Sequence, residues 1–371
     1  MSDDDYGLSA VKKTSTIPAP EVAYKPRKPK TYNPPIGLIG AGGITGSHLT
    51  AYKALGLNVV AIADLNRENA EKKQAQFYPE ATIYTDHREL LARDDIEVVD
   101  VATHVNVRPQ LVRDALEAGK HVLSQKPFAT DLAEGRALVE LAKEKNLRLA
   151  VNHNGRWAPH FSYLRNAIAQ GLIGEVNSVN CVCHWDHTWV KGLPAFESMQ
   201  HVILYDFSIH WFDIVTCFMS GERPKRVFAT AQRFEGQVFA PPSIASVIME
   251  YENAQVCMQF HGHVLHGEED TTTVNGTRGT LRSRGASLNA QPQIELYLED
   301  GIATAPLEGH WFDYGFQGTM AELLCAIDEN REPSNSAASN LVALETCFAA
   351  MKSADTGQPV VPGSVQKLES Y

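Results

Sequence analysis

The sequence predicts an α/β protein of two domains. The first is a doubly wound parallel sheet, and the second is an α/β domain with a large, open, mostly antiparallel sheet. Strand-like and helix-like segments alternate in the first half, and a glycine-rich turn joins the first strand to the first helix. Separate strand-like segments fill much of the second half. With 371 residues, the chain is long enough to bury two cores.

The first domain is expected over residues 36–155, where short apolar segments alternate with helical ones. A helical segment, Thr45–Ala54, lies between two apolar strands and completes one βαβ unit. The run Ile96–Thr103 is apolar on both faces, which indicates a parallel sheet covered by helices on each side. The expected strands are Ile36–Gly40, Asn58–Asp64, Ala81–Tyr84, Ile96–Thr103, His121–Ser124 and Arg148–Asn152, with further helices at Asp86–Arg93 and Leu111–Ala118.

The glycine-rich turn, Gly40–Gly46, indicates a dinucleotide site. Its glycines permit a tight turn and bring bare backbone close to a pyrophosphate at a helix N-terminus. About twenty residues later, Asp64 ends the next strand, where a carboxylate binds ribose hydroxyls and repels a 2′-phosphate. This favours NAD, although Arg67 leaves NADP open. Thr45 stands where a small residue usually allows close helix packing. The pattern predicts a Rossmann domain.

Lys126 is the second notable feature of this domain. The strand His121–Ser124 leads into Gln125-Lys126-Pro127, and the proline fixes φ and removes one backbone donor. Because ligands bind at the carboxyl edge of such sheets, Lys126 is expected on the cofactor edge.

These segments together resemble the Gfo/Idh/MocA family, named for glucose-fructose oxidoreductase, inositol dehydrogenase and a rhizopine-catabolism protein. The similarity extends from Ile36 almost to the C-terminal end, and its main carriers are the glycine turn, Asp64, Val98–Thr103, Ala115–Val122, Gln125-Lys126-Pro127 and Ser353–Val360. The resemblance implies an NAD(P)-dependent oxidoreductase of sugars, cyclitols or related polyols.

The sequence departs from the family's pattern at one motif position. The family's usual tripeptide is Glu-Lys-Pro, and Gln125 replaces the glutamate. The replacement removes a negative charge, so we expect a weaker charge-assisted hold on the ammonium of Lys126.

Asp206 and His210 lie four residues apart in a helix expected to begin near Val202, on one face of it. Such a pair is more often structural than catalytic. The resemblance, however, implies that Lys126, Asp206 and His210 act together. His210 is then the base that takes the hydroxyl proton, and Lys126 donates a hydrogen bond to the reacting oxygen. Asp206 orients His210 or binds a neighbouring hydroxyl.

The segment His153–Trp157 follows the last expected strand of the first domain, and the resemblance places it at the junction facing substrate. A hydrated interdomain hinge is the alternative. A metal site is not expected at His261, His263 and His266, because no carboxylate or cysteine nearby completes a coordination shell. The expected cofactor residues are Gly40, Gly42, Gly43, Ile44, Asp64, Arg67, Thr103, His104, Asn106, Gln125 and Lys126, and the expected substrate residues are Lys126, Asn154, Arg156, Trp157, His184, His187, Asp206 and His210.

The second domain is expected over residues 156–371 and ends in two helices, the later at Asn340–Ala354. The resemblance implies that the uncovered face of its sheet pairs with another subunit, giving a homodimer or homotetramer. Residues 1–35 are rich in proline and lysine, which indicates an extended arm reaching a neighbouring subunit or a disordered tail. The expected strands are Gly174–Thr188, Lys225–Phe234, Ser243–Tyr251, Gln255–His263, Thr271–Val274 and Ile294–Leu298.

Composition excludes some classes of protein. A net charge of −11 without a basic cluster argues against nucleic-acid binding, and no apolar run is long enough for a membrane span. The acidic start has neither a secretory nor a transit pattern, so a cytoplasmic protein with six reduced cysteines is expected.

Three functions remain open from the sequence. The leading one is an NAD-dependent dehydrogenase of a secondary ring hydroxyl on a sugar, glycoside or cyclitol. The second is a lyase, hydrolase or epimerase that oxidises its sugar transiently with tightly bound NAD. The third is a non-catalytic regulator that responds to NAD and sugar, against which the joint presence of Lys126, Asp206 and His210 counts.

Overall fold

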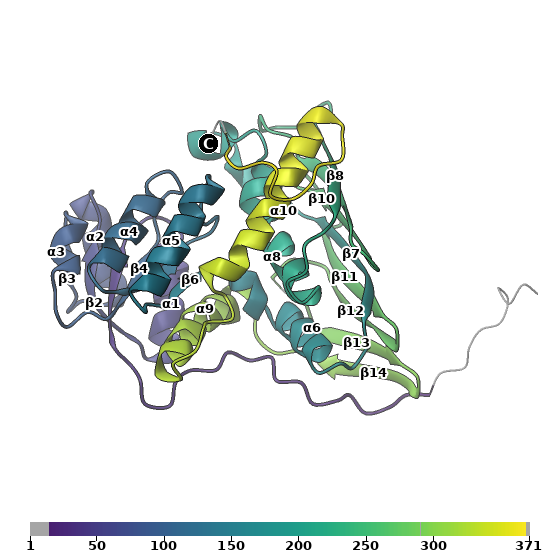
Figure 1. Cartoon of the computed structure of the whole chain (residues 1–371), viewed down its shortest axis with the longest axis horizontal. Helices are drawn as coiled ribbons and strands as arrows, with labels where there is room; N and C mark the ends of the chain where they lie inside the picture. Colours follow the sequence, from purple (N-terminus) through teal and green to yellow (C-terminus); the bar gives the residue numbers. More distant parts are fainter. Residues whose placement is uncertain (1–14, 290, 369–371) are drawn as a thin grey trace, which may run out of the picture.

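The computed structural model describes residues 15–289 and 291–368, which form two sheets with helices around and between them (Figure 1). The first sheet has six parallel strands in the order β3-β2-β1-β4-β5-β6. This order reverses direction between β1 and β4, which is the topological switch point where dinucleotides bind. The predicted doubly wound sheet is confirmed.

The first sheet forms because its central strands are apolar on both faces. All four residues of β4 are buried, and helices cover the sheet on both sides. Its helix α2 was not expected from the sequence, because that segment is strongly polar. The strands are β1 (Pro35–Ile39), β2 (Asn58–Ala63), β3 (Thr82–Tyr84), β4 (Val98–Val101), β5 (His121–Ser124) and β6 (Leu149–Val151), and the helices are α1 (Thr45–Leu55), α2 (Arg67–Phe77), α3 (His87–Leu91), α4 (Arg108–Glu117) and α5 (Leu132–Glu144).

The second sheet has eight strands in the order β14-β13-β12-β11-β7-β10-β9-β8, and only the β7–β10 pair is parallel. The expectation of a large, mostly antiparallel sheet is confirmed. Two of its strands, β12 and β14, were not expected from the sequence. The strands are β7 (Val176–His184), β8 (Arg226–Gln232), β9 (Ile244–Glu250), β10 (Gln255–His261), β11 (Glu269–Gly276), β12 (Gly279–Gly285), β13 (Gln293–Leu298) and β14 (Gly301–Pro306).

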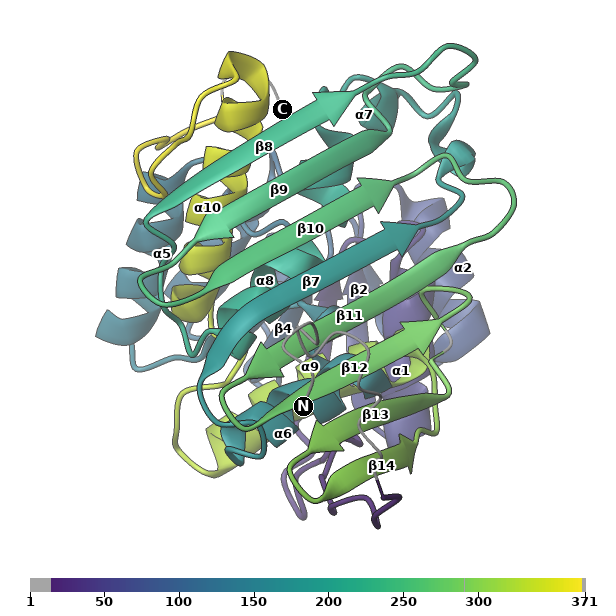
Figure 2. The same ribbon diagram turned by 90° about the vertical axis from the view of Figure 1, so that its right-hand side faces the viewer.

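One face of the second sheet packs on helices, and the other is open. Figure 2 looks onto the open face, and the helices lie behind the strands. Alternate residues of β7, including Cys181 and Cys183, are buried against the helical layer. The remaining helical elements are η1 (Asn154–Trp157), α6 (Pro159–Ala169), η2 (Thr188–Val190), α7 (Pro194–Glu197), η3 (Ile203–Phe207), α8 (Ile209–Phe218), α9 (Trp311–Asp328) and α10 (Ala337–Thr356).

The two sheets are joined by helices from the end of the chain, which lie between them in Figure 1. Helix α9 packs on α1, and its side chains Phe316, Met320, Leu323 and Leu324 belong to the core of the first sheet. The C-terminal segment therefore completes the Rossmann core before α10 packs on α5 and α8.

Residues 15–34 form an extended arm along the chain's own surface, at the lower edge of Figure 1. The amide of Ile17 donates to the carbonyl of Ile302 on β14 at 3.0 Å. Tyr163 and Asn166 of α6 donate to arm carbonyls, and Lys25 pairs with Glu308 at 2.6 Å. The described part of the arm is bound within its own subunit, and residues 1–14 lie outside the described residues.

Within residues 15–289 and 291–368, no helix combines the length and apolar character needed to cross a membrane. All six cysteines are unpaired, and four of them are buried.

Candidate active site

The glycine-rich turn has the geometry of a pyrophosphate cradle. Gly40 has φ +97°, and a Cβ there would lie 2.7 Å from the carbonyl oxygen of Ala102, so only glycine fits. A Cβ at Gly42 or Gly43 would meet no atom within 4 Å, so the backbone surface over the turn is open. No side chain caps the N-terminus of α1, which leaves this helix end for an anion.

Asp64 holds the turn as well as ending β2. One carboxylate oxygen accepts a hydrogen bond from the amide of Ala41 at 2.7 Å, and the other accepts from the amide of Asn66 at 2.8 Å. Asp64 is only partly exposed, and it lies where a ribose reaches the end of the second strand. The residues therefore fit a dinucleotide bound across this edge.

The other expected cofactor residues lie around the same edge and differ in their burial and in whether they already have a partner. Thr103 packs against Gly40, and its hydroxyl is buried without a partner. Ile44, His104 and Asn106 are exposed. Arg67 is paired with Glu71 on its own helix at 2.8 Å.

Lys126 links the two domains. Its ammonium donates to the backbone carbonyl of Asp206 at 2.7 Å and to the Asp206 carboxylate at 3.1 Å. The two side chains are 18% and 21% exposed, so the pair lies at the rim of an accessible space. The structure thus brings together two of the three catalytic candidates, 80 residues apart in the chain.

The backbone around Asp206 differs from the expected helix. Residues Ile203–Phe207 form a π-helical turn, and α8 begins only at Ile209. The amide of Ser208 donates to the carbonyl of Ile203 at 2.7 Å. Asp206 and His210 therefore belong to different elements, and within the described residues no hydrogen bond joins them. Such π-turns are frequent at functional sites. This one presents the backbone carbonyl and one carboxylate oxygen of Asp206 to Lys126.

His210 lies beside this pair and is partly exposed. Burial, followed by the positive charge of Lys126 and the nearby ring of His153, lowers the pKa of His210 well below its usual value. Its Nδ1 is buried without a partner, so Nε2 is the ring nitrogen accessible to a ligand. The ring packs at 5.5 Å from Trp311 and at 5.8 Å from His153. A neutral imidazole with one open nitrogen can accept a proton.

His187 faces the same site from the end of β7. Its Nδ1 accepts a hydrogen bond from the indole nitrogen of Trp185 at 2.9 Å. A neutral ring that accepts at Nδ1 carries its proton on Nε2, and this Nε2 is buried without a partner. Burial lowers the pKa of His187 to about 4, with Asp206 and Lys126 as its main charged neighbours. His187 therefore offers an unused N–H donor.

The segment after β6 contributes less than expected to the open site. Asn154 lies next to His210 through Gly155, and its oxygen accepts from Trp311 at 2.9 Å. Arg156 is buried and paired with Asp213 by two bonds of 2.6 Å. Trp157 packs on α9 and under a guanidinium. The structure does not bring Arg156 or Trp157 to Lys126.

His184 lies on the other side of its sheet. Cys181 and Cys183 point to the helical layer, so His184, one residue further, points to the open face. There its ring centroid lies 6.2 Å from that of His261, and Glu269 of β11 is its cross-strand neighbour. The structure therefore separates His184 from the site that contains His187.

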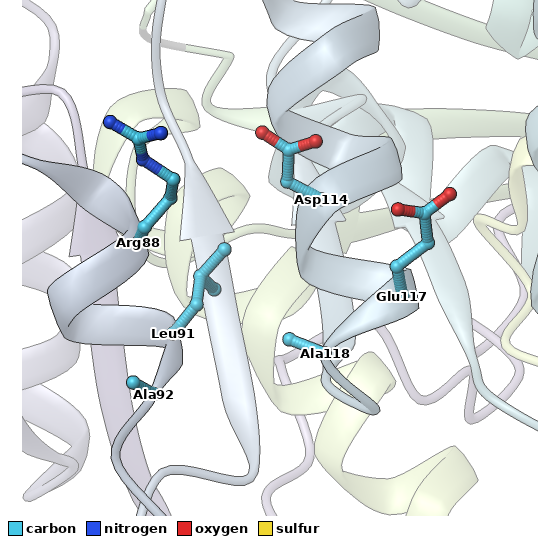
Figure 3. A pocket seen from close by; sticks show the side chains of 6 residues that line it. All are labelled: Arg88, Leu91, Ala92, Asp114, Glu117 and Ala118. Carbon is cyan, nitrogen blue, oxygen red and sulfur yellow. The ribbon is translucent and has the colours of Figure 1, made fainter.

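A hollow on the first domain carries none of these residues. It lies between α3 and α4, and Arg88, Leu91, Ala92, Asp114, Glu117 and Ala118 line it (Figure 3). Among the described residues, no three His, Cys, Asp or Glu side chains are grouped closely enough to hold a metal ion.

Sequence reasoning missed His48, the buried partner of Gln125. The amide nitrogen of Gln125 lies 2.9 Å from Nε2 of His48, and the amide oxygen accepts from the backbone N–H of Lys126 at 2.7 Å. Among the described residues, no contact joins this amide to the ammonium of Lys126. The only sequence signal for His48 was its place in the helix after the glycine turn.

Family models match both halves of the chain. Residues 35–153 match a model described as "Oxidoreductase family, NAD-binding Rossmann fold", and residues 161–282 match the "GFO/IDH/MocA C-terminal domain". The chain belongs to the Gfo/Idh/MocA family. It is an NAD-binding oxidoreductase of a family whose members act on CH–OH groups, and the glycine turn and Asp64 agree with the NAD site.

Relatives in this family share the full fold. The chain is 26% identical to the D-apiose dehydrogenase of Paraburkholderia graminis over 87% of its own length and 88% of that protein. It is 26% identical to the inositol 2-dehydrogenase of Rhizobium meliloti, covering 85% and 96% of the two chains. An oxidoreductase from Agrobacterium radiobacter, solved with NAD+, L-tartaric acid and magnesium, has a TM-score of 0.80 at 23% identity, over 90% of this chain and 99% of that one.

Proposed function

We propose that the protein is a cytoplasmic NAD-dependent dehydrogenase that oxidises a secondary ring hydroxyl of a sugar, glycoside or cyclitol. The observation that carries the proposal is the cluster of Lys126, Asp206 and His210 beside the open glycine turn. The relatives named above act on a pentose and on inositol, which supports this substrate class.

Each residue of the cluster has a defined part in the proposed reaction. NAD+, when bound, supplies the acceptor for the hydride that leaves the hydroxyl-bearing carbon. His210 takes the hydroxyl proton at Nε2, since its lowered pKa keeps the ring neutral before the reaction. Lys126 donates a hydrogen bond to the same oxygen and stabilises its developing negative charge. In the reverse direction, His210 returns the proton to the alcohol.

The polar groups around the cluster suit a polyol. Asp206 keeps carboxylate oxygens for an adjacent hydroxyl, and the free Nε2–H of His187 suits an acceptor oxygen. Trp185 stacks on Phe207 with ring centroids 3.7 Å apart, which gives the site an apolar wall. Such walls pack against the C–H faces of sugar rings.

The decisive experiment is a panel of sugars, inositols and glycosides offered with NAD or NADP and followed at 340 nm. We expect stoichiometric NADH from at least one sugar or cyclitol and a preference for NAD. Substrate consumption without accumulating NADH would reject net dehydrogenation in favour of transient oxidation. Full turnover by a Lys126→Ala, His210→Ala double variant would reject the residue assignment.

We also propose that the open face of the second sheet pairs subunits into a homodimer or homotetramer. Phe228 and Ile248 are cross-strand neighbours on this face and remain 38% and 42% exposed in the single chain. Light scattering coupled to size exclusion tests this, with Phe228→Lys, Ile248→Lys expected to lower the mass to that of a monomer. An unchanged mass would place the contact elsewhere.

A further inference from the structure

A buried polar cluster of the first domain lies behind the cofactor turn and touches the backbone of Lys126. Its members are His48 and Tyr52 of α1, Asp100 of β4, Gln125 after β5 and Asn152 after β6. All five side chains are buried, and four of them are completely inaccessible. Among the described residues, Oδ1 of Asp100 and Oδ1 of Asn152 have no hydrogen-bond partner, whereas both nitrogens of the His48 ring are paired.

The orientation of Gln125 follows from the backbone. The N–H of Lys126 can only donate, so the atom of Gln125 that lies 2.7 Å away must be the oxygen. The amide nitrogen then faces Nε2 of His48 at 2.9 Å as a donor. The amide of Asn152 approaches the same Nε2 at 3.1 Å.

The state of His48 follows from its neighbours. With an amide donor at Nε2, this nitrogen must accept and therefore carries no proton. The other nitrogen, Nδ1, lies 2.7 Å from the carboxylate of Asp100 and donates to it. Tyr52 donates to the same oxygen at 2.6 Å, and burial together with the Asp100 charge raises the pKa of Tyr52 well above its usual value, so it stays protonated.

No other titratable group faces this ring among the described residues. Strands β5 and β6 present only the two amides, and α9 presents Phe316, whose ring lies 4.8 Å from that of His48. Beyond the ring, the charge of Arg108 acts on Asp100. The groups that act directly on the protonation of His48 are therefore the Asp100 carboxylate at Nδ1 and the residue at position 125 at Nε2.

We propose that His48 and Gln125 are a charge-matched positioning pair. Neutral His48 holds the amide of Gln125, and the amide holds the backbone of Lys126 at the cofactor edge. The family's usual glutamate at position 125 would place a carboxylate oxygen against Nε2, and only a protonated His48 could donate to it. Gln125 thus holds the backbone of Lys126 without needing a charge on His48.

The inference predicts a sign for the effect of Gln125→Glu. The new carboxylate raises the folded-state pKa of His48 in the variant. Stability from this pairing is then fully present below the unfolded value of about 6.5 and is lost as pH rises through the raised value.

The test uses the full-length protein labelled with ¹⁵N-histidine, with the His48 signals assigned by their loss in His48→Gln. In the wild-type protein at neutral pH we expect Nδ1 protonated and Nε2 unprotonated. In Gln125→Glu both nitrogens are protonated at pH 6, and one proton leaves as pH rises. A protonated Nε2 in the wild-type protein would overturn the proposal, whether or not the variant folds.

The consequence for catalysis rests on the proposed role of Lys126, whereas the tautomer of His48 does not. We expect kcat/KM of Gln125→Glu to fall relative to wild type as pH rises, while Gln76→Glu, an exposed control on α2, follows the wild-type profile. His48→Phe should lower kcat about tenfold with little change in the KM for sugar, and His48→Gln, which keeps a donor and an acceptor, should recover part of it. Parallel pH profiles of Gln125→Glu and wild type would overturn the positioning role.

Discussion

The two walls of the site differ in how completely their histidine rings are paired. The Rossmann wall comprises Gln125, Lys126 and the buried cluster around His48, where both nitrogens of the His48 ring have partners. The C-terminal wall comprises Asp206, His187 and His210, and each of its two histidines has a buried ring nitrogen without one. A ring with both nitrogens paired is held in one orientation, whereas the unpaired N–H of His187 leaves one hydrogen bond to be made. The contrast agrees with the proposed function, in which the first wall positions Lys126 and the second binds the substrate.

The largest expected effect comes from removing the link between the walls. Lys126→Met deletes the ammonium that binds Asp206 and, in the proposed reaction, the donor to the reacting oxygen. We expect kcat/KM to fall about 10³-fold, because one such donor is worth 10²–10³. Steady-state kinetics would check this, with Lys143→Met on the exposed face of α5 as control. A loss below tenfold would show that Lys126 is not part of the reaction.

His187 of the C-terminal wall should make the stability of the protein sensitive to acid. Burial lowers the pKa of His187 to about 4 in the folded protein, compared with about 6.5 in the unfolded chain. Between these two pH values the unfolded chain binds a proton at this residue and the folded protein does not. The free energy of unfolding should fall by about 2 kcal/mol between pH 7 and 5 from this residue. Urea denaturation would measure it, and His187→Gln should have a shallower pH dependence. Equal slopes in the two proteins would contradict the assignment.

A third prediction concerns the cofactor turn, which lies on the Rossmann side of the site. Asp64→Ala removes the acceptor for the amides of Ala41 and Asn66. We expect the Kd for NAD+ to rise about tenfold, or about 1.4 kcal/mol, and the preference over NADP to narrow. Calorimetric titration would measure both constants, with the exposed Asp94→Ala as control. Unchanged NAD+ affinity would mean that the turn keeps its shape without Asp64.

The smallest effect concerns the tautomer of His187. Trp185→Phe keeps the stacking on Phe207 but removes the indole donor that fixes the His187 proton on Nε2. The KM for the sugar should rise about threefold with kcat nearly unchanged, because a ring free to change tautomer offers its donor only part of the time. Initial rates over a range of sugar concentrations would show it. A fall in kcat alone would place His187 in the chemistry.

The Rossmann sheet was predictable because its signals are local. Strand, glycine turn, helix and Asp64 follow one another within thirty residues, and central strands buried on both faces are apolar throughout. In the open sheet, one face is solvated, so alternate residues are polar. Strand β12 has the charged Arg282 and Arg284 on that face, and β14 consists mainly of small residues. Neither strand stands out from a loop by composition.

The site was predictable only in part. Lys126 and His210 were found through motifs, but the contacts that decide their neighbours' roles join distant segments. Arg156 pairs with Asp213, 57 residues away, and His48 with Gln125, 77 residues away. The π-turn before α8 spans Ile203–Phe207, and the pattern of its residues does not distinguish it from a turn of α-helix. Periodicity carries no information about such pairings.

The arm has a consequence for how the chain is made. Ile17 and Lys25 leave the ribosome long before their partners Ile302 and Glu308, the latter 283 residues after Lys25. At about 5–20 residues per second, the arm waits roughly a quarter of a minute to a minute for its binding surface. Its proline-rich composition suits that wait, because such a segment neither collapses nor forms a competing strand. Residues 15–34 are therefore synthesised well before the surface that binds them.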